Sequence, residues 1–133
     1  MRGFTVGLIL SALLIATGSA KAPLSETEAA TAAEISGKYA SNYASLTLTI
    51  DDLGHFEGLF ERQNVFGQLQ GEFIDRQIVG HWVADSGDRP CASERLGSRY
   101  WGRVVLDFAA GNAFEGSFGY CGEAPSQPWS GSR

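Results

Sequence analysis

Hydrophobic and polar residues alternate along most of this chain, and one alternating pattern recurs. An apolar residue, a glycine and an aromatic residue occupy every second position in five places. These copies are Ile35-x-Gly37-x-Tyr39, Phe56-x-Gly58-x-Phe60, Leu69-x-Gly71-x-Phe73, Ile78-x-Gly80-x-Trp82 and Phe114-x-Gly116-x-Phe118, and a weaker sixth is Trp129-x-Gly131-x-Arg133. Period-two alternation is typical of half-buried strands. Since an aromatic ring from a neighbouring strand can fill the gap at each glycine, the repeat predicts a strongly curved antiparallel β-structure.

The alternation and the turns between its segments predict about eight consecutive short strands. We expect these strands over residues 35–39, 45–50, 55–61, 65–73, 78–84, 99–108, 113–120 and 129–133. Most connections are short, which favours an all-β, antiparallel up-and-down barrel. Closure of the barrel would leave no strand edge unpaired. A two-sheet β-sandwich is the alternative.

The first 34 residues have a different composition. Residues 1–20 are expected to be a secretory signal peptide, with Arg2 before an apolar run and small residues at Gly18-Ser19-Ala20 for cleavage. The apolar run is short for a retained membrane anchor. Residues 21–34 are rich in Ala and Glu, and Ser25 and Glu28 have capping-box spacing. This segment is predicted to be a short helix over residues 26–34, or alternatively a tether, before a single β-domain at residues 35–133.

The charge of the chain restricts its partners. Removal of Arg2 with the signal peptide leaves nine basic and fifteen acidic side chains, a net charge of −6. Binding to phosphate-rich surfaces requires a basic face, so we expect no nucleic-acid partner and no anionic membrane partner. We expect no membrane span in the mature chain, which would be a periplasmic or secreted bacterial protein.

The chain has two cysteines, Cys91 and Cys121. In an oxidising compartment they are expected to form one disulfide, joining the long break at residues 85–98 to the end of the seventh strand. The chain has no C-x-x-C motif and neither histidine is close to a cysteine in the sequence, so we expect no metal site and no cofactor. Weak Ca²⁺ binding by Asp85-Ser86-Gly87-Asp88 is a lesser alternative to a simple turn.

The order of these motifs resembles small exported bacterial β-domains of unknown function, which carry repeated G-x-[WYF] strands and end on W-x-G-x-R. The segments that carry the resemblance are FEGLFER, GQLQGEF, IVGHW, WGRVVLDF, FEGSFGYC and WSGSR, within residues 35–133. The strands also resemble avidin-type and lipocalin-like barrels in architecture. These resemblances imply a fold, and we transfer no ligand-binding residue from them.

Few residues suggest catalysis. His55 and His81 are expected on the outer face, and the carboxylates of the strands are expected to face water. The sequence contains no G-x-S-x-G, P-loop or H-E-x-x-H motif. A hydrolase of unknown type is therefore the third of three functional hypotheses.

The first hypothesis is a non-enzymatic module that binds a protein or glycan partner in the cell envelope. Alternation places Leu59, Phe66, Val79, Val83, Trp101 and Val105 on the outer face, and Arg99 and Arg103 flank Trp101 there. Trp and Arg are common at the centres of binding interfaces, and a contiguous apolar patch marks such a surface. Scattered exposed apolar residues are the ordinary alternative.

The second hypothesis is a carrier of a small apolar ligand inside the barrel. The inward aromatic residues Tyr39, Phe60, Phe73, Trp82 and Phe118 would line its pocket. The alternative is a plain core, because the side chains of an eight-stranded barrel can fill its interior.

Overall fold

A computed structural model describes residues 22–109 and 111–133 of the chain. The predicted signal peptide, residues 1–20, lies outside the described residues. The described chain forms helix α1 (Glu26–Ile35) and strands β1 (Gly37–Ser41), β2 (Ser45–Ile50), β3 (His55–Arg62), β4 (Val65–Ile74), β5 (Gln77–Ala84), β6 (Tyr100–Asp107), β7 (Ala113–Phe118) and β8 (Gln127–Ser132). Each predicted strand agrees with an observed strand to within two residues at either end.

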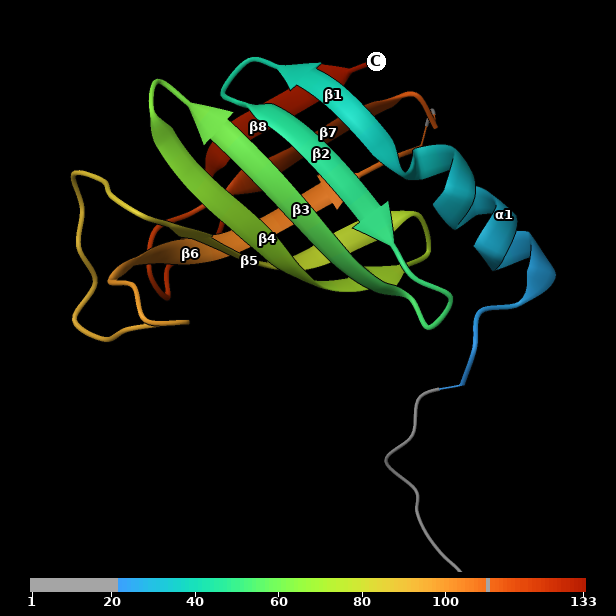
Figure 1. Ribbon diagram of the computed structural model, residues 1–133, viewed down its shortest axis with the longest axis horizontal. Helices are drawn as coiled ribbons and strands as arrows, with labels where there is room; N and C mark the ends of the chain where they lie inside the picture. The colour runs from blue at the N-terminus through green and yellow to red at the C-terminus, as the bar shows by residue number, and fades with distance from the viewer. Residues whose placement is uncertain (1–21, 110) are drawn as a thin grey trace, which may run out of the picture.

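The eight strands form a closed barrel in sequence order, with every neighbouring pair antiparallel (Figure 1). The first and last strands close it through the pairs Ala40–Ser132 and Ser41–Gly131. The prediction of an all-β, up-and-down barrel is therefore confirmed, and the sandwich alternative is wrong.

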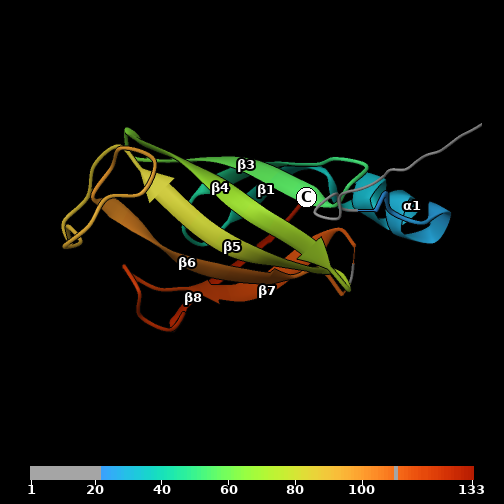
Figure 2. The same ribbon diagram turned by 90° about the horizontal axis from the view of Figure 1, so that it is seen from below.

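The two ends of the barrel are built differently (Figures 1 and 2). At the helix end, α1 lies beside the turns that follow β2, β4 and β6. At the loop end lie two short turns, which follow β1 and β3, and two longer loops, residues 85–99 and 119–126. We call these regions the helix end and the loop end below.

Helix α1 closes the helix end of the barrel. Ser25 and Glu28 form the predicted capping box at its start. Its apolar residues Ala32 and Ile35 are buried in the core. The predicted strand at residues 35–39 is wrong at its first two residues, because Ile35 is the last residue of α1, Ser36 is its C-cap and β1 begins at Gly37. The Ser36 hydroxyl donates to the Ala32 carbonyl at 2.8 Å, and this contact accompanies the end of the helix.

Arg133 fastens α1 to the barrel. Its guanidinium donates to the carbonyls of Glu34, Ser36 and Gly111, at 2.9 Å for Ser36 and 3.2 Å for Gly111. The group also lies 5.1 Å from the centre of the Tyr39 ring. A cation is favourable at the C-terminus of a helix, where carbonyl groups lack intrahelical partners. The arginine of the sixth repeat therefore joins the end of the chain to the helix.

Inward aromatic rings pack against glycines on the adjacent strand. Five such pairs lie directly opposite each other in the strand register: Phe56–Gly71, Phe60–Gly67, Trp82–Gly102, Phe114–Gly131 and Trp129–Gly116. A Cβ atom at Gly67 would lie 2.1 Å from a Phe60 ring carbon, and one at Gly131 would lie 2.7 Å from the Phe114 ring. The rings thus fill the gaps that the sequence repeat predicts.

The interior is solid toward the helix end. Tyr39, Phe108 and Phe114 are buried there, with ring centres 5.4 to 5.6 Å apart. The Tyr39 hydroxyl donates to the carbonyl of Ile35. Burial raises the pKa of Tyr39, so its phenol remains a neutral donor over the physiological range. The interior of the loop end differs, and it contains the candidate site.

We predict that Gly71→Ala lowers the free energy of unfolding by about 1–3 kcal/mol, because overpacking forces the neighbouring atoms apart. The new Cβ would lie 2.2 Å from the Val79 carbonyl oxygen and 2.7 Å from the Phe56 ring. Gly122→Ala is the matched control, since no atom lies within 4 Å of its added Cβ. Urea unfolding followed by tryptophan fluorescence gives both values. Equal stabilities for the two variants would contradict this account of the packing.

Candidate functional site

A cavity of about 640 Å³ occupies the loop end of the barrel. We call it the mouth cavity. Its aromatic lining residues are Tyr43, Phe60, Trp82, Tyr100, Phe118, Tyr120 and Trp129. A volume of this size is typical of sites for one small molecule, and such sites are mostly apolar with a few polar groups. The arrangement is therefore suited to enclosing a ligand with an apolar body.

Two tryptophans fix the wall and the floor of the mouth cavity. The Trp82 indole N–H donates to the Gly119 carbonyl at 2.8 Å, which holds its ring in place. Trp129 is buried, and its indole N–H donates to the Ser41 hydroxyl at 2.8 Å. Because both indole donors already have partners in the protein, the two rings offer the cavity mainly their apolar surfaces.

Other rings pack around these two at angles typical of aromatic clusters. The centres of the Phe60 and Tyr120 rings lie 6.5 and 5.8 Å from that of Trp82. The Phe118 ring lies 5.9 Å from Trp129 and 4.8 Å from Tyr43. The rings support one another, so contacts within the protein fix the shape of the lining.

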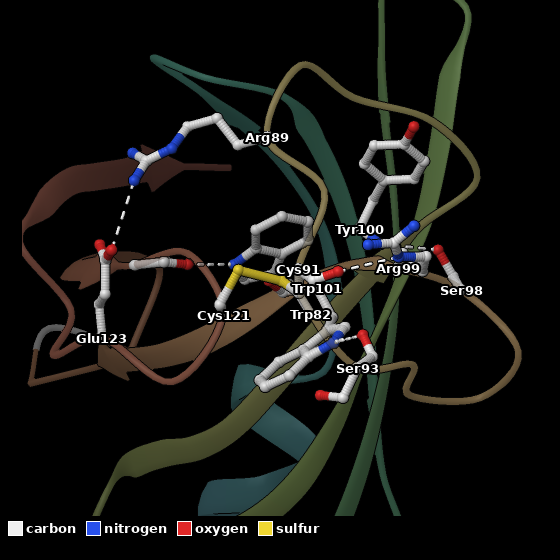
Figure 3. The surroundings of a disulfide bond; sticks show 11 residues. Trp82, Arg89, Cys91, Ser93, Ser98, Arg99, Tyr100, Trp101, Cys121 and Glu123 are labelled. Atoms are coloured by element: carbon white, nitrogen blue, oxygen red, sulfur yellow. Dashed lines mark hydrogen bonds and ion pairs between the residues drawn. A yellow bond between two sulfur atoms is a disulfide. The ribbon is translucent and has the colours of Figure 1, made fainter.

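Two arginines lie at the rim of the mouth cavity. The Arg62 guanidinium lies 4.6 Å from the centre of the Tyr43 ring, and that of Arg89 lies 4.2 Å from the centre of the Tyr120 ring. Arg89 also forms an ion pair with Glu123 at 3.4 Å (Figure 3). Burial is the main cause that raises the pKa of Tyr43, and its phenol is therefore neutral beside Arg62.

The predicted disulfide between Cys91 and Cys121 is confirmed (Figure 3). It joins the 85–99 loop to the 119–126 loop across the end of β6. The Cys91 N–H donates to the Arg99 carbonyl at 2.7 Å, and the Cys121 N–H donates to the Trp101 carbonyl at 2.8 Å. Both loops contribute residues to the rim, Arg89 from one and Tyr120 from the other. The disulfide thus links two sides of the mouth cavity.

The predicted partner-binding residues lie outside the barrel, where the 85–99 loop packs over Trp101 but leaves Arg99 and Arg103 exposed. The Trp101 indole N–H donates to the Ser93 carbonyl at 3.0 Å (Figure 3), and the Arg95 guanidinium lies 5.3 Å from the Trp101 ring centre. The Arg99 side chain donates to the Cys91 carbonyl at 2.9 Å. Arg103 is exposed on the same strand.

The outer apolar residues do not share one environment. Leu59, Phe66 and Val79 are exposed as expected, and Val105 is half-buried. Val83 shares the outer face with Trp101, as predicted, but it is buried there, with only 7% of its surface exposed. Its cross-strand neighbour Trp101 carries the 85–99 loop through Ser93 and Arg95.

The five predicted pocket residues divide between the two ends. Phe60, Trp82 and Phe118 line the mouth cavity. Tyr39 and Phe73 are buried toward the helix end and belong to the core.

Sequence reasoning missed the other residues of the mouth cavity. Tyr43, Arg62 and Arg89 lie in or beside turns and loops, where alternation gives no direction for a side chain. The terminal W-x-G-x-R copy could have identified Trp129 as an inward residue, since it is two positions from the inward Gly131 and lies on the same face of the strand.

Neither histidine lies at the mouth cavity. His55 lies at the helix end, 3.3 Å from an Asp51 carboxylate oxygen and 3.9 Å from one of Glu72. His81 lies outside the barrel beside Trp101. Partial burial, with smaller effects from Arg95 and Arg103, lowers the pKa of His81. Across residues 22–109 and 111–133, no group of three or more His, Cys, Asp or Glu side chains is arranged to hold a metal ion.

A larger hollow, of about 1000 Å³, lies on the outer surface along β1, β7 and β8. Small and polar residues such as Ser130, Ser132 and Asn42 line it. It has no aromatic cluster or pair of basic groups comparable to those of the mouth cavity, so we take the smaller cavity as the candidate site.

No protein-family model, curated protein or solved structure matches this chain. The resemblance to exported bacterial β-domains therefore stays a prediction. Within the part of the chain that the structure describes, no helix has the length and apolar character needed to cross a membrane.

We predict that the double variant Cys91→Ala/Cys121→Ala unfolds with a free energy about 3–4 kcal/mol lower than that of the native protein. Chain-entropy reasoning gives this value for a cross-link between residues 30 positions apart in the sequence. Urea unfolding of the variant and of the oxidised and reduced native protein measures the effect. Reductant should destabilise only the native protein, and a variant as stable as the oxidised protein would contradict the prediction.

Proposed function

We propose that the protein is an exported, non-enzymatic carrier that binds one small molecule with an apolar body in the mouth cavity. The aromatic lining of this cavity is the observation that carries the proposal. Burial of apolar ligand surface against such rings is favourable by roughly 25 cal/mol for each Å² removed from water. The preformed lining lowers the cost of ordering side chains when the ligand binds.

The position of the cavity also supports a carrier. The helix end is closed by α1 and the buried core, so a ligand has to enter and leave at the loop end. An eight-stranded barrel has room for one small ligand when its own side chains do not fill it. Here the filled half provides stability and the hollow half provides the site.

Export is part of the proposal. The predicted signal peptide and the Cys91–Cys121 disulfide both suit an oxidising compartment such as the periplasm or the extracellular space. A hydrophobic molecule that crosses an aqueous compartment needs a protein that shields it from water, and this role suits a small barrel with a dedicated cavity.

The binding of a protein or glycan through Trp101, Arg99 and Arg103 is less well supported by the geometry. Trp101 already uses its indole donor and lies beside the Arg95 guanidinium. Arg99 is engaged with the Cys91 carbonyl. Nor does any arrangement around the mouth cavity favour the hydrolase hypothesis, because neither histidine lines it.

We predict that the neutral fluorescent probe N-phenyl-1-naphthylamine binds in the mouth cavity with 1:1 stoichiometry. Its emission should rise on binding, and tryptophan emission should fall through energy transfer. Trp82→Ala should weaken probe binding about tenfold, because the cavity loses a large apolar wall.

Trp101→Ala is the matched control, since Trp101 lies outside the barrel and should leave probe affinity within about twofold of the native value. The proposal fails if the native protein does not bind the probe, or if Trp101→Ala abolishes binding while Trp82→Ala does not.

A further inference from the structure

We infer that the ligand of the mouth cavity has a negatively charged, carboxylate-type head group, which Arg62 and Arg89 bind at the rim. The apolar body of the ligand would lie among the aromatic rings below. This inference rests on the proposed function and adds the chemical class of the ligand to it.

The two arginines reach the rim from different elements. Arg62 is the last residue of β3, and Arg89 belongs to the 85–99 loop. Each guanidinium packs on a tyrosine ring that also lines the cavity, Arg62 on Tyr43 and Arg89 on Tyr120. Stacking on an aromatic ring leaves the edge of the guanidinium free to donate hydrogen bonds. Both arginines therefore line the same cavity, each held against one of its tyrosine rings.

The charge of the lining differs in sign from that of the protein. The whole chain has a net charge of −5. The mouth cavity, in contrast, has two arginines and a single acidic residue, Asp88, in its lining. Two cations beside an apolar, partly enclosed space attract an anion more strongly than they would in open water. Once a ligand replaces the exposed Glu123 at Arg89, the two arginines outnumber Asp88, and the local charge favours an anionic ligand in an otherwise acidic protein.

Neither arginine is held by a strong ion pair, although Arg62 also forms a side-chain hydrogen bond with Tyr43. Within the described part of the chain, no carboxylate forms an ion pair with Arg62. Arg89 pairs with Glu123, but the two side chains are 53% and 63% exposed. Exposed ion pairs of this kind contribute little to stability. A carboxylate on the ligand can therefore replace Glu123 at Arg89 at small cost.

The planar guanidinium of an arginine can donate two parallel hydrogen bonds to a carboxylate, which makes a carboxylate a well-matched ligand group. The neutral phenol of Tyr43, beside Arg62, supplies a further hydrogen-bond donor at the rim. The rim therefore offers donors, and the cavity below offers apolar rings. A molecule with an apolar aliphatic or aromatic body and one carboxylate matches both parts.

The test compares three ligands that share a chain length and differ in the head group: decanoate, 1-decanol and decylamine. Each displaces N-phenyl-1-naphthylamine from the full mature protein at neutral pH. We expect decanoate to bind at least about tenfold more tightly than 1-decanol, because hydrogen bonds to charged groups are the strong ones. Decylamine should bind most weakly.

Variants separate the role of the arginines from that of the cavity. Arg62→Gln/Arg89→Gln should weaken decanoate at least about tenfold and change 1-decanol by less than about threefold. Arg62→Lys/Arg89→Lys keeps both charges and should restore part of the preference. Arg103→Gln, an exposed arginine outside the barrel, is the control and should change neither affinity. Thermal unfolding of each variant verifies that it folds.

The outcomes distinguish this inference from the proposed function. Equal affinities for decanoate and 1-decanol, or tighter binding of decylamine, would overturn the head-group assignment and leave the carrier in place. A decanoate preference that survives Arg62→Gln/Arg89→Gln would also overturn it. If neither the probe nor any of the three ligands binds the native protein, the proposed function itself is wrong.

Discussion

The packing of inward aromatic rings against glycines on the next strand determines the shape of this barrel. A glycine opposite a large ring lets the ring lie flat over the backbone, so strands can curve tightly without a clash. Phe60 over Gly67 and Phe114 over Gly131 show how little space remains at these positions. The same packing places the rings inside the barrel, where they form the core at one end and line the cavity at the other.

The difference between the two ends comes from what packs beyond the rings. At the helix end, α1 inserts Ile35 below the aromatic core, and Arg133 holds the helix in place. At the loop end, residues 91–98 do not enter the barrel. They pack over Trp101 on the outside through Ser93 and Arg95, and the disulfide anchors the loop there. The interior of this end therefore remains hollow, with Trp129 as its floor and two arginines at its rim.

Period-two alternation was enough to predict the barrel, because alternation is a local property of the sequence. In each repeat the glycine and the aromatic residue are two positions apart, so both lie on the inward face of the strand. The Cys91–Cys121 disulfide also followed from the sequence, since two cysteines allow one pairing. The cavity at the loop end could not be predicted from the sequence. Phe73 and Phe118 have the same pattern in the sequence and both are buried in the core, but only Phe118 also lines the cavity. The difference depends on α1 and the loops, whose packing is tertiary.

Dependence on tertiary packing also explains why alternation did not predict the surroundings of several residues. Arg62 and Arg89 lie where a strand ends or a loop runs, so their convergence on one cavity depends on the closure of the barrel. Trp101 was correctly placed outside the barrel, but no local signal indicated that Ser93 and Arg95 would cover it. Ile35 was correctly expected to be buried, yet it reaches the core from a helix.

The three tryptophan indoles report on the central claim directly, since Trp82 forms the wall of the cavity, Trp129 its floor, and Trp101 lies outside. Two-dimensional ¹⁵N–¹H NMR resolves their side-chain N–H signals during a titration with decanoate. The account predicts that the Trp82 and Trp129 signals shift with one saturating binding curve, while the Trp101 signal stays fixed. A shift confined to Trp101, or no shift of any indole signal, would contradict it.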